Sequence, residues 1–257
     1  MRKITKALQV IYSVYAFLTF ILLMFCVFPL ALMASIWGKM KGGNFIYRVC
    51  RVWADIWMAL IGIFHRNIFE SAPDNSRQFI FVANHISYMD IPVILKTIRG
   101  RPFRVLGKSE MIKIPIFGLI YQYAAVLVDR GNPDARTKSV HHLKSILQKG
   151  ISVFIFPEGT FNESGRPLKN FYDGAFRIAI ETGTPIKPVL FLDTFDRLHY
   201  SSLFSLTPGR SRAVFLEPVS TTGMDLGDIA DLKLKVYTMM EQKLMEYQAS
   251  WVSATYR

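Results

Sequence analysis

The stretch Phe79-Ile80-Phe81-Val82-Ala83-Asn84-His85-Ile86-Ser87-Tyr88-Met89-Asp90 joins a short apolar run to a polar segment. Such a run is typical of a buried strand, and in an α/β sheet the residues after a strand face a crevice. His85 and Asp90 are five residues apart, so they do not share one face of a regular helix and can meet only across a turn. A carboxylate that holds one imidazole nitrogen would leave the other to act as a general base. Alone, a histidine at a strand end is more often structural than catalytic.

Short apolar runs alternate with helical stretches along the rest of the chain. Predicted strands are Phe79–Ala83, Phe103–Leu106, Ala125–Val128, Ser152–Phe156, Ile186–Leu192 and Arg212–Leu216. Predicted helices are Ile91–Ile98, Ile114–Tyr123, Asp134–Gln148, Gly174–Thr182 and Asp228–Trp251. Strands separated by helices indicate an α/β fold with a mixed, largely parallel sheet flanked by helices.

The N-terminal region differs from the rest in its hydropathy. No charged residue occurs from Ala7 to Gly38, a run longer than the roughly 20 residues that one membrane span needs. Pro29 interrupts it, which leaves two interpretations: a tilted or kinked single span, or a helix that enters the bilayer and returns. Basic residues on both flanks favour the second, with both ends in the cytoplasm.

Gly42-Gly43-Asn44 predicts a break in the chain, with Asn44 as the N-cap of a second helix over Phe45–Phe64. That helix is amphipathic, and both a bilayer interface and the core of the domain suit it. We expect an N-terminal helical membrane anchor and interfacial helix over residues 1–70 and a catalytic domain over residues 71–257.

The charge pattern indicates the kind of partner. The net charge is +12, and residues 1–68 hold eight basic side chains against Asp55 alone, flanking apolar sequence. This favours anionic membrane lipid over nucleic acid. Two cysteines are too few for a disulfide framework, so we expect the catalytic domain on the cytoplasmic face of the membrane. No Cys/His spacing indicates a metal site.

Further polar groups follow other predicted strands. Phe156-Pro157-Glu158-Gly159-Thr160 offers a carboxylate and a hydroxyl, and Val128-Asp129-Arg130-Gly131 a guanidinium suited to phosphate. Gly107-Lys108-Ser109 adds a cation, and Thr184-Pro185 precedes a strand. Each also has an ordinary structural interpretation, as a β-turn, a surface ion pair or a proline turn.

In this order, from Phe79 to Leu192, these motifs resemble the four-motif series of the 1-acylglycerol-3-phosphate O-acyltransferase (PlsC-type) family of glycerolipid acyltransferases. The resemblance implies that a fatty acyl group passes from acyl-CoA or acyl-carrier protein to the free hydroxyl of 1-acylglycerol 3-phosphate, giving phosphatidic acid. Either thioester would be a co-substrate, and no cofactor is implied.

The resemblance also implies residue roles. His85 would deprotonate the hydroxyl and Asp90 would orient His85. The acceptor would be bound by residues at four strand ends, and Pro185 would lie near the acyl donor. These acceptor-binding candidates are Asn84, Lys108, Arg130, Glu158, Gly159 and Thr160.

The chain departs from the family pattern at two positions near these residues, and the first departure bears on the acceptor. Phe161 stands where an arginine is common, and Lys187 where an apolar residue is usual. Other hypotheses are therefore O-acylation of another lysolipid, such as a lyso-aminolipid, hydrolysis of a thioester or ester, and a non-catalytic membrane scaffold. The absence of a Gly-x-Ser-x-Gly elbow disfavours a serine nucleophile.

Overall fold

The computed structural model describes residues 2–128 and 133–256. One seven-stranded sheet runs in the order β1-β7-β6-β2-β5-β3-β4. The strands are β1 (Ile63–Phe69), β2 (Ile80–Ala83), β3 (Phe103–Lys108), β4 (Ala125–Val128), β5 (Ser152–Ile155), β6 (Ile186–Phe191) and β7 (Gly209–Phe215). The helices are α1 (Arg2–Ser35), α2 (Gly38–Leu60), α3 (Asp90–Thr97), α4 (Phe117–Ala124), α5 (Pro133–Gln148), α6 (Gly174–Thr182), α7 (Thr194–Arg197) and α8 (Ile229–Glu246). Short 3₁₀ turns are η1 (Ser109–Lys113), η2 (Leu203–Ser205), η3 (Leu226–Asp228) and η4 (Ala254–Tyr256).

The sheet is parallel except where β7 pairs with β6 in antiparallel fashion. Strands β2 to β6 therefore all end at one edge of the sheet, here called the carboxyl edge, and all begin at the opposite amino edge. The predicted α/β fold with a mixed, largely parallel sheet is confirmed.

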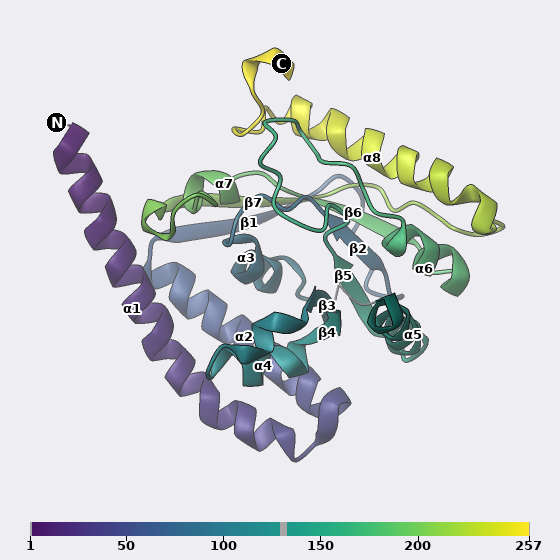
Figure 1. Ribbon diagram of the computed structural model, residues 1–257, viewed down its shortest axis with the longest axis horizontal. Helices are drawn as coiled ribbons and strands as arrows, with labels where there is room; N and C mark the ends of the chain where they lie inside the picture. The colour runs from purple at the N-terminus through teal and green to yellow at the C-terminus, as the bar shows by residue number, and fades with distance from the viewer. Residues whose placement is uncertain (1, 129–132, 257) are drawn as a thin grey trace.

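Successive side chains of a strand pack in two separate hydrophobic clusters, one on each face of the sheet. Phe81 and Ala83 pack in a cluster with residues of α1 to α4, whereas Ile80 and Val82 pack with residues of α5, α6 and α8. The period of two along β2 explains this division, because successive side chains point to opposite faces of a sheet. Figure 1 shows the two helical layers, with α1, α2 and α4 on one side of the sheet and α5, α6 and α8 on the other.

Helices α1 and α2 form an antiparallel hairpin (Figure 1). The indole N–H of Trp57 donates to the carbonyl of Ala16 at 2.9 Å, and the Tyr12 hydroxyl donates to the carbonyl of Ile61. Pro29 lies inside α1 without ending it. The chain thus turns back only after α1, and both membrane interpretations of the apolar run stay predictions.

The prediction that Gly42-Gly43-Asn44 breaks the chain is wrong, because all three lie inside α2. The glycines permit close approach: a Cβ on Gly42 would stand 2.2 Å from the carbonyl oxygen of Ala34, and one on Gly43 would stand 2.5 Å from the Arg104 guanidinium. Asn44 caps no helix; its Oδ1 accepts a hydrogen bond from Arg104 Nη2 at 2.8 Å. The buried Arg104 thereby ties α2 to β3.

The apolar surface of α1 is largely uncovered. Lys6–Ser35 is long and apolar enough to cross a membrane, with a mean hydropathy of 2.6, and only 22% of its most apolar window is buried. It is the one such helix among the described residues. Helix α2, in contrast, buries Ile46, Trp53 and Trp57 in the cluster between the hairpin and the sheet, so it contributes to the core of the domain.

Sequence analysis missed one strand. Ile63–Phe69 was expected to belong to the anchor, yet it forms β1 and pairs with β7 along its whole length. Several of its side chains are exposed, whereas the inner strands β2, β5 and β6 are buried at every position, since β1 lies at the edge of the sheet. The division at residue 70 stays a prediction, and the sheet begins on the N-terminal side of it.

The close packing of the hairpin makes a stability prediction. Gly42→Ala forces a methyl group against the backbone of Ala34, so we expect a loss of about 1–3 kcal/mol in the free energy of unfolding, typical of overpacking. Gly174→Ala is the matched control, because a Cβ there meets nothing within 4 Å. Thermal unfolding of both variants in detergent micelles measures the difference. Equal stability of the two variants would contradict this packing.

Candidate active site

His85 and Asp90 meet at the carboxyl edge. The Nδ1 atom of His85 lies 2.7 Å from Oδ2 of Asp90, across the turn between β2 and α3. The same oxygen accepts the backbone N–H groups of Ile86 at 2.8 Å and Ser87 at 3.0 Å. Asp90 is the first residue of α3, where the helix dipole favours a negative charge. The predicted turn between the two residues is therefore present.

Burial makes this pair a strong one. Asp90 is 0% exposed, and its Oδ1 atom has no hydrogen-bond partner within the described ranges. A buried carboxylate is costly unless it is well paired, so Oδ2 must hold its three donors firmly. Since an ionised carboxylate only accepts hydrogen bonds, we infer that His85 Nδ1 carries the proton and donates it to Oδ2 in this hydrogen bond.

Aromatic rings fix the plane of the imidazole. The ring of His85 stacks on Phe156 with centroids 4.0 Å apart and an interplanar angle of 14°, and it meets Phe161 edge-on at 4.4 Å. The side chain keeps 17% exposure, and Nε2 makes no hydrogen bond with any residue that the structure describes. One nitrogen is therefore held while the other is open to a substrate. Phe156 belongs to the core that α1 and α2 share, so the imidazole lies on the hairpin side of the sheet.

Glu158, in the loop after β5, holds the turn that carries His85. Its Oε1 accepts the backbone N–H of His85 and its Oε2 that of Lys169, each at 2.8 Å. Burial raises the pKa of Glu158 to about 8, against the two backbone donors, which lower it. The backbone N–H of Asn162 in turn donates to the carbonyl of His85 at 2.8 Å. Both backbone polar groups of His85 are thus held by the loop after β5.

Asn84 has a similar structural part. It is 1% exposed; its Nδ2 donates to the carbonyl of Phe191 at 3.0 Å, and its Oδ1 accepts the N–H of Phe191 at 2.8 Å. Both ends of the amide are occupied by β6. This geometry favours positioning of His85 over the direct acceptor contact that the family resemblance implied.

Of the expected acceptor-binding residues, Lys108 is a cation that the structure places at the carboxyl edge. Lys108 ends β3 and is exposed; it lies two ladders from β2, roughly 10 Å across the sheet. Arg130 follows β4, the next strand, but lies outside the described residues. Thr160 is exposed and accepts a hydrogen bond from Lys169 Nζ at 2.7 Å, while Gly159 is buried with a φ of 75° that favours glycine.

Pro185 is not brought to this edge. Its carbonyl accepts the N–H of Ile80, the first residue of β2, and β6 then runs parallel to β2 toward the site. Pro185 therefore lies at the amino edge, a full strand length from His85. The end of the same strand, Phe191, is the part that contacts the site through Asn84.

Lys169 and Phe156 are site residues that sequence reasoning missed. Phe156 was read only as the end of a strand, although its place beside Glu158 in Phe-Pro-Glu was a usable signal. Lys169 lies in a loop without periodicity, and only the fold brings its Nζ to Thr160.

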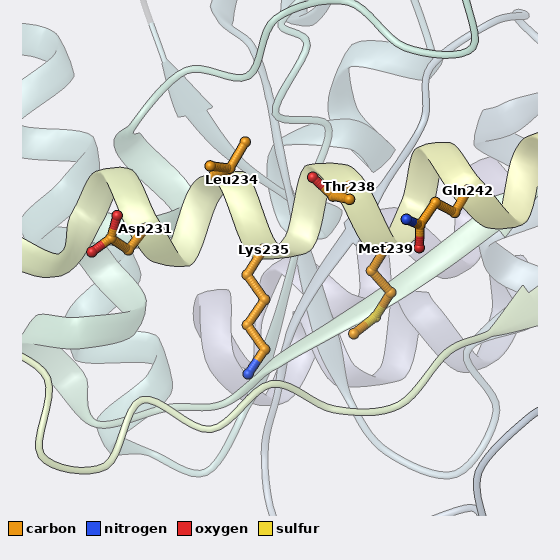
Figure 2. Close-up of a pocket in the computed structure, with 6 residues that line it drawn as sticks. All are labelled: Asp231, Leu234, Lys235, Thr238, Met239 and Gln242. Carbon is orange, nitrogen blue, oxygen red and sulfur yellow. The ribbon is translucent and has the colours of Figure 1, made fainter.

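One hollow on the surface lies away from these residues. It has a volume of about 480 Å³ and follows the solvent side of α8, and all six lining residues come from that single helix (Figure 2). None of the candidate residues lines it, and no other element encloses it, so it has no part in the site. No group of three or more His, Cys, Asp or Glu within the described ranges could hold a metal ion.

Comparison with known proteins identifies the family. The family model described as Acyltransferase matches residues 66–192. A 1-acyl-sn-glycerol-3-phosphate acyltransferase of Escherichia coli is 33% identical over 175 residues, which cover 65% of this chain and 67% of that protein. One from Haemophilus influenzae is 28% identical over 195 residues, covering 73% and 78%.

A chloroplastic relative from Arabidopsis thaliana is 29% identical over 186 residues, 71% of this chain. The chain spans about half of that longer protein, 51% of its length. The crystal structure of the acyltransferase PlsC from Thermotoga maritima has the same fold, with a TM-score of 0.75 and 24% identity over 98% of this chain and all of that one. Together with the His85–Asp90 geometry, these matches show that the chain belongs to the 1-acyl-sn-glycerol-3-phosphate acyltransferase family.

Proposed function

We propose that this protein transfers a fatty acyl group from a thioester to the free hydroxyl of 1-acylglycerol 3-phosphate, giving phosphatidic acid. The observation that carries the proposal is the His85 ring, with Nδ1 held by buried Asp90 and Nε2 open. Relatives named 1-acyl-sn-glycerol-3-phosphate acyltransferases support the choice of acceptor.

The chemistry needs one base and no covalent enzyme intermediate. His85 Nε2 takes the proton of the acceptor hydroxyl as its oxygen attacks the thioester carbonyl. The tetrahedral intermediate collapses with cleavage of the C–S bond, and the imidazolium returns the proton to the departing thiolate. Asp90 stabilises the imidazolium in between. Acyl-CoA and acyl-carrier protein both supply the required thioester.

The acceptor's phosphate needs cations near His85. Lys169 is a candidate, because its Nζ lies on Thr160, two residues beyond the carboxylate that binds the His85 backbone. Lys108 extends the positive edge toward β4, and Arg130 remains a predicted contributor beyond it. Phe161, which meets the His85 ring edge-on, stands where the family commonly has an arginine. Lys169 would supply the positive charge near the His85 ring that this arginine would otherwise provide.

The hairpin suits an acceptor that is insoluble in water. The exposed apolar surface of α1 supports insertion into one leaflet, with the catalytic domain on the cytoplasmic face and basic flanks on anionic lipid. Because His85 stacks on Phe156 in the core shared with the hairpin, an acceptor hydroxyl could approach without leaving the membrane surface.

Removal of the general base tests the mechanism. His85→Ala should lower kcat about 10²–10⁴-fold, the usual contribution of general-base catalysis. His141→Ala, an exposed histidine on α5, is the control and should keep wild-type activity. Phosphatidic acid formation from a labelled thioester measures both. A His85→Ala enzyme with full activity would overturn the mechanism.

Lys169 gives a prediction about the acceptor. Lys169→Met should raise KM for 1-acylglycerol 3-phosphate about tenfold, typical of a lost charge-assisted hydrogen bond, while KM for the thioester stays unchanged. Lys149→Met, at an exposed position directly after α5, is the control. Monoacylglycerol, which lacks the phosphate, should be used equally well by wild type and variant. A loss that is equal for both acceptors would remove Lys169 from phosphate binding.

Glu158 predicts a pH dependence of stability. A glutamate of the unfolded chain ionises near pH 4.3, whereas the pKa of folded Glu158 is about 8. Between these values the folded protein holds one proton more than the unfolded chain. The free energy of unfolding therefore falls as pH rises, by up to about 1.4 kcal/mol per pH unit.

Glutamine cannot ionise, so Glu158→Gln should be destabilised most at mildly acidic pH and least at mildly alkaline pH, relative to wild type. Glu163→Gln, an exposed neighbour in the same loop, should show no such trend. Thermal unfolding at a series of pH values measures the difference. A deficit of Glu158→Gln that does not change with pH would contradict a protonated Glu158 in the folded protein.

A further inference from the structure

A second pocket opens at the amino edge of the sheet, the edge opposite to that of His85. Its volume is about 150 Å³, far more than the roughly 10–15 Å³ that one water needs. Four phenylalanines, from the start of β2 and the ends of β1 and β7, provide its apolar lining: Phe69, Phe79, Phe81 and Phe215. Two loops wall it, and they touch where the Asn75 side chain lies over Gly100, so closely that a Cβ on Gly100 would stand 2.3 Å from Asn75 Oδ1.

Arg101 brings an unsatisfied donor to this pocket. The residue lines the pocket, and its Nη1 atom is buried without a hydrogen-bond partner in the described part of the chain. A guanidinium carries five N–H donors in a fixed plane, and leaving one buried and unpaired is unfavourable. An oxyanion in the pocket would supply the missing acceptor.

Lys187 brings a second cation from another element. It projects from β6, is 5% exposed and donates to the hydroxyl of Ser71. Burial lowers the pKa of this ammonium group, and the carboxylates of Glu217 and Asp74 offset part of that effect. Two of its three N–H donors have no assigned acceptor in the described ranges, in a position where the family usually has an apolar residue.

The other charged groups that line the pocket already have partners of opposite charge. Arg99 binds the carboxylate of Asp55 through both terminal nitrogens. Asp74 accepts from Ser76 through Oδ1 and from Arg77 through Oδ2. Arg101 and Lys187 are therefore two cations of the pocket that form no ion pair with a carboxylate of its lining.

We propose that this pocket is an anion site, separate from the active site, in which Arg101 and Lys187 bind a phosphate group. Its aromatic lining excludes water around the bound anion and strengthens the contact. The loop that carries Arg101 contacts α2, since Arg51 donates to the carbonyl of Arg99. The phosphate can thus come from the solvent or from a lipid headgroup at the hairpin.

The test measures binding and needs no turnover. Calorimetric titration of inorganic phosphate into the full-length protein in detergent micelles, at matched ionic strength, should detect binding to wild type and equally to His85→Ala. Arg101→Ala should weaken it about tenfold to a hundredfold, the range for loss of a charge-assisted hydrogen bond. Lys187→Met, which removes the ammonium group and keeps an unbranched side chain of similar shape, should weaken it as well.

Two controls separate this site from alternatives. Arg177→Ala removes a positive charge from the exposed face of α6 and should bind phosphate as wild type does. Lys169→Met removes the cation proposed for the acceptor's phosphate at the carboxyl edge, and it should keep the component of phosphate binding that Arg101→Ala removes. Unchanged binding by Arg101→Ala, or binding lost in Lys169→Met instead, would overturn the proposal even if the acyltransferase activity is as proposed.

Nanodiscs identify the source of the phosphate. Protein in phosphatidylcholine nanodiscs is compared with protein in nanodiscs that also contain phosphatidylglycerol. If a headgroup fills the pocket, the anionic lipid should raise the Tm of wild type and of Arg177→Ala more than that of Arg101→Ala, and free phosphate should compete with it. Equal shifts for all three proteins, together with phosphate binding lost in Arg101→Ala, would support the site with free phosphate as its ligand.

Discussion

The carboxylate of Asp90 is the group on which the rest of the site depends. One of its oxygens binds the His85 ring and two backbone N–H groups of the same turn, so a single buried charge fixes both the imidazole and the path of the chain between β2 and α3. A charge without exposure to water is tolerable only when such donors surround it. The position of Asp90 at the start of α3 adds the helix dipole. The interaction that orients the base thus also folds the loop that carries it.

Neighbouring strands hold the same turn from outside. Glu158 binds the backbone N–H of His85 from β5, and Asn84 binds Phe191 of β6 through both ends of its amide. These contacts involve backbone groups and leave the imidazole edge open. Burial disfavours the charged form of Glu158 and raises its pKa to about 8. The stacking of His85 on Phe156 connects this arrangement to the core beneath the hairpin.

Much of the fold could be predicted from the sequence, because the inner strands are short apolar runs with polar residues at both ends. The same runs placed His85, Lys108 and Glu158 at one edge, since parallel strands end together. Edge strand β1 was missed, as an exposed strand lacks the continuous apolar pattern of a buried one. Gly42 and Gly43 were misread, because only the packed hairpin reveals a close approach.

The details of the site were less accessible. Pro185 was assigned to the acyl donor through the family resemblance, yet the direction of β6 puts it at the amino edge. Lys169 reaches Thr160 through a loop whose path no periodicity encodes. Lys187 was noted as a departure in an apolar block, and its partners became visible only when the strand was placed beside the loops at the amino edge.

The most direct test of the account measures thiol release from the acyl thioester with and without 1-acylglycerol 3-phosphate. If His85 activates the acceptor hydroxyl for direct attack, thiol release requires the acceptor, and one phosphatidic acid forms for each thiol released. A burst of thiol equal to the enzyme concentration without acceptor would reveal an acyl-enzyme intermediate. Continued release at the same rate without acceptor would reveal a hydrolase, and either result would contradict the mechanism.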